Sequence, residues 1–223
     1  MLDLDALRSA VDLHVVVVAG AEPLPARAVA ELPDRITVLA ADGGLDHARA
    51  AGLQPAALIG DLDSVTPEGL AWAEAHATIA RHDPDKDRTD TELALATAAE
   101  LAPARLTLLS GGGDRLDHTL AAIGALGHHS LTAIPIVEAW WGDQYLRVLP
   151  GPGRATFTGL AIGTTVSLLS AHGVCEGVGI SGVQWPLDQF RLEPLVGLGV
   201  SNVTTADTVA VTVATGVLTI VVA

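Results

Sequence analysis

Short apolar runs alternate with amphipathic segments along the first two thirds of the chain. The apolar runs predict strands at residues 14–19, 36–41, 56–60, 77–81, 106–110 and 133–139. The segments between them predict helices at residues 45–51, 67–75, 90–101 and 115–127. Strands that alternate with helices form a mostly parallel sheet with helices on both faces. We therefore predict a doubly wound α/β domain at residues 1–142, with ligands bound beyond the carboxyl ends of its strands.

Three of the predicted helices carry recognisable start signals. Thr89 and Glu92 have the spacing of a capping box, in which each residue satisfies a backbone N–H near the other. Thr66 precedes Pro67, as expected for an N-cap followed by proline at the first helical position. Asp114 is placed to cap the helix that follows three glycines.

The pattern changes after about Trp141. A Pro-Gly-Pro-Gly stretch at residues 150–153 breaks the chain, and no helical period follows it. Apolar residues at 209, 211 and 213 alternate with smaller or polar ones, and Thr215-Gly216 then precedes an apolar run at 217–222. This is the pattern of a strand, a turn and a second strand. We predict an all-β domain, a sandwich, at residues 143–223.

The charge of the chain narrows the set of possible ligands. Acidic residues outnumber basic ones 26 to 12, which gives a formal net charge of −14. Such a field repels nucleic-acid backbones and anionic membrane surfaces, so neither is expected as a partner. An acidic protein can bind a nucleotide if a divalent cation offsets the repulsion, and the charge therefore hints at a metal. The hydrophobic fraction of 49% and the mean hydropathy of +0.43 exclude a disordered chain.

The cysteine count and the N-terminal segment bear on location. Cys175 is the only cysteine, which excludes an internal disulfide and a multi-cysteine zinc site and fits a reducing compartment. The apolar run at 15–19 follows acidic rather than basic residues, unlike a signal peptide, and is far shorter than the ~20 residues of a membrane span. We therefore expect a cytoplasmic protein.

Four acidic motifs follow predicted strands of the first domain, at the edge of the sheet where ligands bind. Each combines carboxylates with glycine or with a helix N-terminus, and this clustering is harder to attribute to chance than any one motif. The motifs are Ala41-Asp42-Gly43-Gly44, Gly60-Asp61-Leu62-Asp63-Ser64, Asp85-Lys86-Asp87-Arg88-Thr89-Asp90, and Gly111-Gly112-Gly113-Asp114-Arg115-Leu116-Asp117-His118.

Asp61 and Asp63 are the first candidates for a metal site. In extended backbone, residues two apart point to the same side, so both carboxylates would face one spot. Two adjacent carboxylates repel each other unless a cation lies between them, and Mg²⁺ takes oxygen ligands and bridges substrate phosphates. The alternative is a surface turn in which Asp63 or Ser64 caps the next helix. Taken alone, this motif leaves the two interpretations open.

The other motif residues also have structural explanations. Asp90 and Asp117 lie in first turns, where a carboxylate stabilises the helix dipole. Asp42 fits an ordinary turn, although the adjacent Gly43 also lets a phosphate approach the backbone. Arg115 is either a solvated helix charge or a phosphate clamp, and His118 alone is more often a packed histidine. The glycine run matches neither the P-loop nor the dinucleotide fingerprint, so phosphate chemistry here would depend on aspartates and Mg²⁺.

Together the motifs resemble those of the thiamine pyrophosphokinases. The order Ala-Asp-Gly-Gly, Gly-Asp-x-Asp-Ser, Lys-Asp-x-Thr-Asp-x-Glu and Gly-Gly-x-x-Arg-x-Asp-His follows the family pattern from Asp42 to His118. The tail adds a Ser-Leu strand at 167–168, a Gly-x-x-Trp-Pro-Leu loop at 182–187 and a Ser-Asn pair at 201–202. The resemblance covers nearly the whole chain in order, and the visible departure is the lead-in at 111–114.

The resemblance implies a fold, an activity and a set of site residues. The implied fold is an α/β catalytic domain followed by a β-sandwich. The implied assembly is a homodimer with active sites between the α/β domain of one subunit and the β domain of the other. The implied Mg²⁺–ATP site comprises Asp42, Gly43, Asp61, Asp63, Lys86, Thr89, Asp90, Arg115, Asp117 and His118, with Asp42, Asp61, Asp63 and Asp90 as metal ligands. The implied thiamine site comprises Trp185, Ser201 and Asn202, although a tryptophan before proline and a Ser-Asn pair are also ordinary packing and turn residues.

The activity expected from the resemblance is transfer of a pyrophosphoryl group from Mg²⁺-bound ATP to the hydroxyl of thiamine, with release of AMP. Catalysis would be mainly positioning and charge stabilisation, with Asp90 or Asp117 accepting the hydroxyl proton. Two alternatives stay open at this point. One is a related pyrophosphokinase for another heterocyclic alcohol, such as a hydroxymethylpterin. The other is a non-catalytic thiamine or nucleotide sensor, which should have lost one or more of the aspartates.

Overall fold

The computed structural model describes residues 12–20, 22–113 and 115–223, and the chain forms two compact units. The first unit ends at Asp143, and the second extends from Gln144 to Ala223. The sequence placed this division one residue earlier, between 142 and 143. None of the helices in the described ranges is long and apolar enough to cross a membrane.

The first unit contains a parallel sheet. Its strands are β1 (His14–Val18), β2 (Thr37–Ala41), β3 (Pro55–Gly60), β4 (Thr78–Arg81), β5 (Arg105–Ser110) and β6 (Ile136–Trp141). All pairings within the unit are parallel, and the strand order is β6-β5-β1-β2-β3-β4. The order reverses beside β1, because β2 lies on one side of it and β5 on the other. This reversal is the topological switch point of a doubly wound sheet, where ligands bind.

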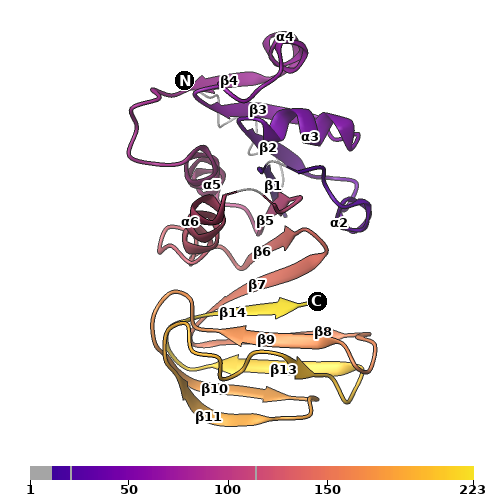
Figure 1. The fold of residues 1–223 in the computed structure, drawn as a ribbon, viewed down its shortest axis with the longest axis vertical. Coiled ribbons are helices and arrows are strands. Elements are labelled where there is room, and N and C mark those ends of the chain that lie inside the picture. Colours follow the sequence, from indigo (N-terminus) through magenta and orange to yellow (C-terminus); the bar gives the residue numbers. More distant parts are fainter. Residues whose placement is uncertain (1–11, 21, 114) are drawn as a thin grey trace. The chain divides into compact units, whose positions relative to one another are not determined.

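Helices cover both faces of this sheet. They are α2 (Ala26–Ala30), α3 (Gly44–Ala50), α4 (Pro67–His76), α5 (Asp90–Glu100) and α6 (Leu116–Leu126). Helices α5 and α6 lie on one face, and α2 and α3 lie on the other (Figure 1). Side chains of α4 pack with Leu45 of α3 and Leu58 of β3 in one apolar cluster. The predicted α/β fold class is confirmed, whereas α2 was not predicted.

The start signals read from the sequence are present. Thr89 accepts a hydrogen bond from the Glu92 N–H, and the Glu92 carboxylate accepts one from the Thr89 N–H, which completes the capping box. Thr66 accepts from the Gly69 N–H, with Pro67 in the first turn. Asp114, the third expected cap, lies outside the described residues. Helix α6 has Arg115 at its N-cap position, and the Arg115 side chain forms no capping hydrogen bond.

The second unit is a sandwich of two antiparallel sheets. One has the order β12 (Asn202–Val203), β9 (Thr165–Leu169), β14 (Val217–Val222) and β7 (Gln144–Pro150). The other has the order β11 (Leu187–Leu192), β10 (Cys175–Ser181), β13 (Thr208–Val213) and β8 (Gly153–Thr158). Both sheets contribute to one buried cluster, including Leu168 and Ile220 from the first and Ile180 and Val211 from the second. The predicted all-β sandwich is confirmed.

The strand pair expected at residues 209–222 is present as β13 and β14, but these strands do not pair with each other. β13 pairs with β8 and β10, while β14 pairs with β7 and β9. The turn at Thr215-Gly216 therefore carries the chain from one sheet to the other. A Cβ on Gly216 would lie within 3.0 Å of the Cys175 Cα, so only glycine fits this crossing.

Candidate active site

A pocket of about 750 Å³ lies in the first unit, at the carboxyl ends of its strands. Its walls come from the segments that follow β1, β2, β3, β4, β5 and β6, and from the starts of α3, α5 and α6. The switch point between β1 and β5 contributes Gly20 and Ser110. A Cβ on Gly20 would lie 2.4 Å from the Ser110 Oγ, so the two segments meet because residue 20 has no side chain.

Three aspartates from different elements come together at this pocket. Asp42 follows β2, Asp61 follows β3 and Asp90 begins α5. One carboxylate oxygen from each lies within 4.8 Å of the others. Asp42 and Asp90 line the pocket. We call Asp42, Asp61 and Asp90 the carboxylate trio.

Gly60 allows the carboxylate trio to form. A Cβ at this position would lie 2.9 Å from the Asp90 Oδ1 and 3.2 Å from the Asp42 Cβ. Its φ of +149° is also a backbone conformation that other residues rarely adopt. Because Gly60, the last residue of β3, has no side chain, Asp42 and Asp90 can approach each other on either side of it.

Asp42 is the most buried member of the trio. Only 9% of its surface is exposed, and its Oδ1 has no hydrogen-bond partner within the described residues. Burial, together with the nearby carboxylates of Asp90, Asp63 and Asp61, raises the pKa of Asp42 to about 6, although a hydrogen bond with Ser64 opposes the rise. A buried carboxylate oxygen without a partner, beside two further carboxylates, suits a hard divalent cation that takes oxygen ligands.

The raised pKa of Asp42 makes the stability of the metal-free protein depend on pH. The Asp42 carboxyl binds its proton more tightly in the folded chain than in the unfolded chain, where its pKa is near 3.8. The resulting stabilisation is therefore complete below about pH 4 and is lost as the pH rises through about 6. Through Asp42, the wild type should lose about 1 kcal/mol of unfolding free energy between about pH 5 and about pH 7.5. The Asp42→Asn variant should not show this loss. Urea unfolding of the metal-free proteins measures this, and an unchanged pH dependence in the variant would refute it.

Lys86 contacts two members of the trio. Its Nζ lies 2.6 Å from the Asp61 Oδ2 and 3.1 Å from the Asp90 Oδ1, and its side chain is 14% exposed. Burial by itself lowers the pKa of Lys86, but hydrogen bonds to Asp61 and Asp90 raise it above its usual value. The bond from Lys86 lowers the pKa of Asp61. The ammonium is therefore charged and fixed between these two carboxylates.

Asp63 does not belong to the carboxylate trio. Extended backbone was predicted across residues 61–63, but Leu62 has a φ of +71°, so the chain turns between the two aspartates. Leu62 is buried in the cluster beneath α4, whereas Asp63 is exposed and accepts a hydrogen bond from the Ser64 hydroxyl at 2.8 Å. The assumed geometry was wrong, and a role for Asp63 as a metal ligand stays a prediction.

Asp46 fixes the loop that follows β3, and it was not among the predicted site residues. The Thr66 N–H and hydroxyl donate to the two oxygens of the Asp46 carboxylate, each at 2.8 Å. A Cβ on Gly69 would lie 2.2 Å from the Asp46 Oδ1, so α4 approaches this carboxylate closely. Asp46 also lines the pocket. Its position in the first turn of α3, directly after Asp42-Gly43-Gly44, was the sequence feature that could have identified it.

Arg115 and Asp117 lie at the start of α6 and bind each other. The Arg115 Nη2 donates to the Asp117 Oδ2 at 2.6 Å and the Arg115 Nε donates to the Asp117 Oδ1 at 3.1 Å. Both side chains are about two-thirds exposed, and neither residue lines the pocket. Hydrogen bonding by Arg115 lowers the pKa of Asp117. His118, by contrast, lines the pocket, as do Gly43 and Thr89.

A second pocket, of about 270 Å³, lies in the second unit. It is lined by Trp185, Leu187, Gly197, Leu198, Gly199, Val200 and Asn202. Of the three residues expected to hold thiamine, Trp185 and Asn202 line this pocket and Ser201 does not. Trp185 is 57% exposed, while Asn202 is 4% exposed. The pocket thus combines an exposed indole ring with a buried amide.

The amide of Asn202 holds the backbone of Trp185. Its Nδ2 donates to the Trp185 carbonyl at 2.6 Å, and its Oδ1 accepts from the N–H groups of Trp185 and Val203. We expect Asn202→Ala to lower the free energy of unfolding by about 2–4 kcal/mol, because buried backbone groups lose their partners. Ser201→Ala is the matched control, since Ser201 is exposed and contributes its backbone N–H to Ser167. Urea unfolding measures the loss of stability in each variant. Equal small losses would mean that the Asn202 amide does not stabilise the backbone of Trp185.

The pocket and its surroundings define the class of protein. An acidic pocket at the switch point of a doubly wound sheet is the arrangement of an enzyme that handles phosphorylated ligands with a divalent cation. Two family models match the chain: the catalytic domain of thiamin pyrophosphokinase over residues 31–137, and its vitamin B1 binding domain over residues 157–218. The chain belongs to the thiamin pyrophosphokinase family, and its activity is the pyrophosphoryl transfer to thiamine for which that family is named.

Several solved structures have the same fold as this chain. Thiamine pyrophosphokinase from Bacillus subtilis is 20% identical with a TM-score of 0.81, and the match covers 95% of this chain and 99% of that chain. The enzyme from Geobacillus thermodenitrificans is 24% identical with a TM-score of 0.75, covering 95% and 96%. The yeast enzyme is 14% identical with a TM-score of 0.72, covering 100% and 90%. No curated protein sequence matches the chain.

Proposed function

We propose that the first unit binds Mg²⁺–ATP with the carboxylate trio as metal ligands, and that the second unit binds thiamine beside Trp185. The observation that carries the metal assignment is the buried Asp42 Oδ1, which lacks a partner within the described residues and faces two further carboxylates. The bound cation would neutralise charge that develops on the phosphates. Asp63 and Asp117 are less well placed for this role, because both are exposed.

The proposed reaction is an in-line displacement at the β-phosphorus of ATP. The thiamine hydroxyl oxygen forms a bond to that phosphorus, the bond to the oxygen bridging the α- and β-phosphates breaks, and AMP leaves with the electron pair. The hydroxyl proton passes to a carboxylate. Of the two acceptors that the sequence offered, Asp90 lines the pocket and Asp117 does not, so the geometry favours Asp90.

The phosphate groups would meet backbone and cationic groups of the same pocket. Gly43, Gly112 and Gly113 line it without side chains, so phosphate oxygens can approach the chain closely. Thr89 and His118 lie on the pocket wall at the starts of α5 and α6, where helix N-termini favour negative charge. Arg115 adjoins this wall, and binding phosphate with its planar fork would require it to leave Asp117.

The direct test is product analysis. The purified protein with ATP, Mg²⁺ and thiamine should form AMP and thiamine diphosphate in equal amounts, and a chelator should stop the reaction. The same assay with a hydroxymethylpterin in place of thiamine tests the nearest enzymatic alternative, a pyrophosphokinase for another heterocyclic alcohol. AMP formation with the pterin alone would overturn the thiamine assignment, and no AMP with either alcohol would favour a sensor.

We also propose that the active protein is a homodimer in the cytoplasm, with thiamine on one subunit meeting ATP on its partner. Support comes from the exposed apolar residues Trp185, Leu195, Leu198 and Val200 near the second pocket, which suit burial against another chain. If sites are shared, mixing inactive Asp61→Asn protein with inactive Trp185→Ala/Ser201→Ala protein should restore about a quarter of the activity by subunit exchange. Activity assays of such mixtures measure this, and no recovery in proven heterodimers would mean that each site uses one chain.

A further inference from the structure

We propose that Lys86 is the resident cation of the carboxylate trio, which it holds together before a divalent metal binds, and that the metal displaces it. Lys86 is thereby a positioning residue for the metal site. The proposal rests on the proposed function, because it takes the trio to be the metal site. It goes further by stating what the trio binds in the metal-free protein and what the metal must remove.

The contacts of Lys86 are the first support. Its ammonium lies 2.6 Å from the Asp61 Oδ2 and 3.1 Å from the Asp90 Oδ1. The oxygens that lie within 4.8 Å of one another come from these same two residues and from Asp42. A cation bound by the trio needs the carboxylates that the ammonium already neutralises. Two positive charges cannot share them at such distances without strong repulsion.

The need for a cation in the metal-free protein is the second support. Because Gly60 has no side chain, carboxylate oxygens of Asp42 and Asp90 lie within 4.8 Å of each other, and Asp61 follows Gly60 directly. Three carboxylates whose oxygens lie within 4.8 Å of one another repel each other unless a cation offsets their charge. Lys86 offsets part of the repulsion, because it pairs with the two members that are more exposed than Asp42.

The identity of the residue is the third support. Lys86 is the only lysine in the sequence, and every other cationic side chain apart from histidine is arginine. An ammonium is a compact charge with three donors on a flexible stem, so it fits among converging carboxylates and can withdraw from them. A planar guanidinium binds carboxylates in a bidentate manner and is held more rigidly. The chain thus places its only lysine where exchange with a metal would require a compact cation on a flexible stem.

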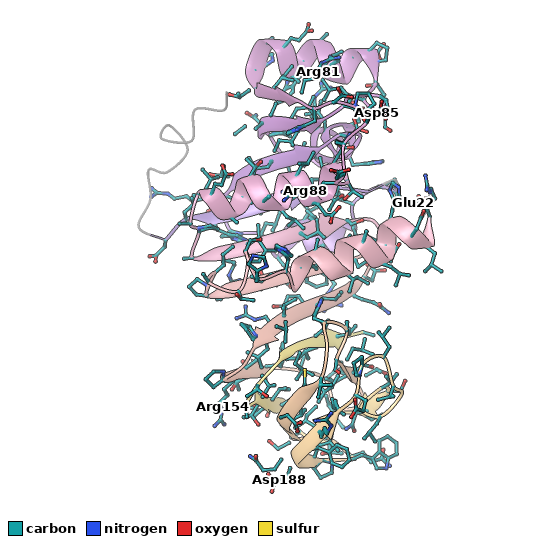
Figure 2. All side chains as sticks on the ribbon, turned by 90° about the vertical axis from the view of Figure 1, so that its left-hand side faces the viewer. Glu22, Arg81, Asp85, Arg88, Arg154 and Asp188 are labelled. Carbon is teal, nitrogen blue, oxygen red and sulfur yellow. The ribbon has the colours of Figure 1, made fainter. Side chains whose placement is uncertain are left out.

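Lys86 lines the pocket, so its ammonium can leave the carboxylate trio without leaving the pocket. It lies in the segment between β4 and α5, between Asp85 and Arg88, which are labelled in Figure 2. Its neighbours Asp85, Asp87 and Arg88 are exposed, and Lys86 itself lines the pocket. A displaced ammonium therefore stays inside the pocket that we assign to ATP. There it would line the nucleotide side of the site, a position that the family resemblance also implies for this residue.

The first experiment measures binding of Mn²⁺ alone by calorimetry, without nucleotide. Lys86→Met should bind Mn²⁺ with a Kd roughly tenfold lower than the wild type, because no ammonium has to be displaced. The metal-free variant should also melt at a Tm roughly 5 °C lower, and saturating Mn²⁺ should abolish that difference. Lys86→Arg should keep the wild-type Tm without metal and bind Mn²⁺ no more tightly than the wild type.

Arg88→Met is the matched control. It removes one positive charge from the same segment and the same pocket, yet Arg88 forms no ion pair with the described carboxylates. Its Kd for Mn²⁺ should change less than about threefold, which isolates general electrostatics. An unchanged or weaker affinity in Lys86→Met, or an equal gain in Arg88→Met, overturns the proposal.

The second experiment uses the wild type and does not depend on how any variant folds. Acetic anhydride should acylate the Lys86 amine roughly threefold faster with Mn²⁺ than without it, because displacement releases the amine from the two carboxylates that hold it. Peptide mass spectrometry separates Lys86 from the N-terminal amine. An equal or slower rate with Mn²⁺ overturns displacement.

These outcomes are distinguishable from failure of the proposed function. If the wild type binds no Mn²⁺ in calorimetry, the trio is not a metal site and both proposals fall together. If the wild type binds Mn²⁺ and forms AMP from ATP and thiamine, but Lys86→Met binds Mn²⁺ as the wild type does, only the displacement of Lys86 is wrong.

Discussion

Asp61→Asn is expected to lower kcat by about a hundred- to a thousandfold while the protein stays folded. Asp61 lies at the proposed metal site and loses a full negative charge in this variant, whereas its neighbour Leu62 keeps the packing of the loop. Loss of one charge-stabilising group at a reacting phosphoryl centre has effects of this size. Formation of AMP from ATP at saturating Mg²⁺ and thiamine measures the change, and circular dichroism checks the fold.

Two further variants make this result interpretable. Asp85→Asn removes a carboxylate from an exposed position that does not line the pocket, and it should retain at least about half of the activity. Asp63→Asn tests the remaining metal-ligand prediction. A loss as large as that of Asp61→Asn would place Asp63 in the site after all, and near-normal activity in Asp61→Asn would refute the trio.

Gly60→Ala is expected to disable the same site without removing any charge. The new methyl group would lie 2.9 Å from the Asp90 Oδ1 and 3.0 Å from the Asp90 Cγ. Asp90 would have to move away from Asp42, so we expect Mn²⁺ binding to weaken by more than about tenfold and stability to fall by about 1–3 kcal/mol from backbone strain. Calorimetry with Mn²⁺ and urea unfolding measure the two effects.

Gly52→Ala separates backbone strain from the collision with Asp90. Gly52 also has a positive φ, +81°, but a Cβ there would meet nothing within 4 Å. This variant should lose about 1–2 kcal/mol of stability and keep the wild-type affinity for Mn²⁺. If Gly60→Ala also kept that affinity, the close approach at Gly60 would not matter for the site.

The strands and the long helices were predictable because their signals are local. Residues 15–18 of β1 are all valine and fully buried, as expected for a central parallel strand. Helix α5 begins at the predicted capping box. Helix α2 could not be predicted in the same way. It has five residues, its N-cap Pro25 forms no side-chain bond, and Ala28 is its only buried residue, so neither a cap nor a period marks it.

Only the part of the site that follows from its position at the strand ends was predictable. The motifs identified which segments meet at the pocket, but not which carboxylates turn toward one another. Asp90 and Asp117 both occupy first turns of helices, yet Asp90 meets Gly60 and Lys86, while Asp117 meets Arg115. These partners come from tertiary packing, which a single motif does not encode.

Backbone geometry accounts for two further differences. The left-handed conformation of Leu62 has no sequence signal, because leucine rarely adopts it. It separates Asp63 from Asp61 although the two residues are neighbours in an acidic motif. Asn202 lines the second pocket and its role toward thiamine stays a prediction, but its amide also binds the backbone of Trp185, which was not predicted. Its hydrogen bonds span 17 positions of the chain, and only the fold shows them.

The place of β14 in the second unit has a consequence for biosynthesis. This strand lies between β7 and β9, although it is synthesised after both. The nascent sandwich therefore lacks an inner strand of one sheet until Val222 has been translated. The strands that the structure describes in the first unit are all complete by Trp141, so that unit can fold while the ribosome is still translating the second. A premature stop at codon 216 would thus leave an intact α/β unit joined to a sandwich that cannot close.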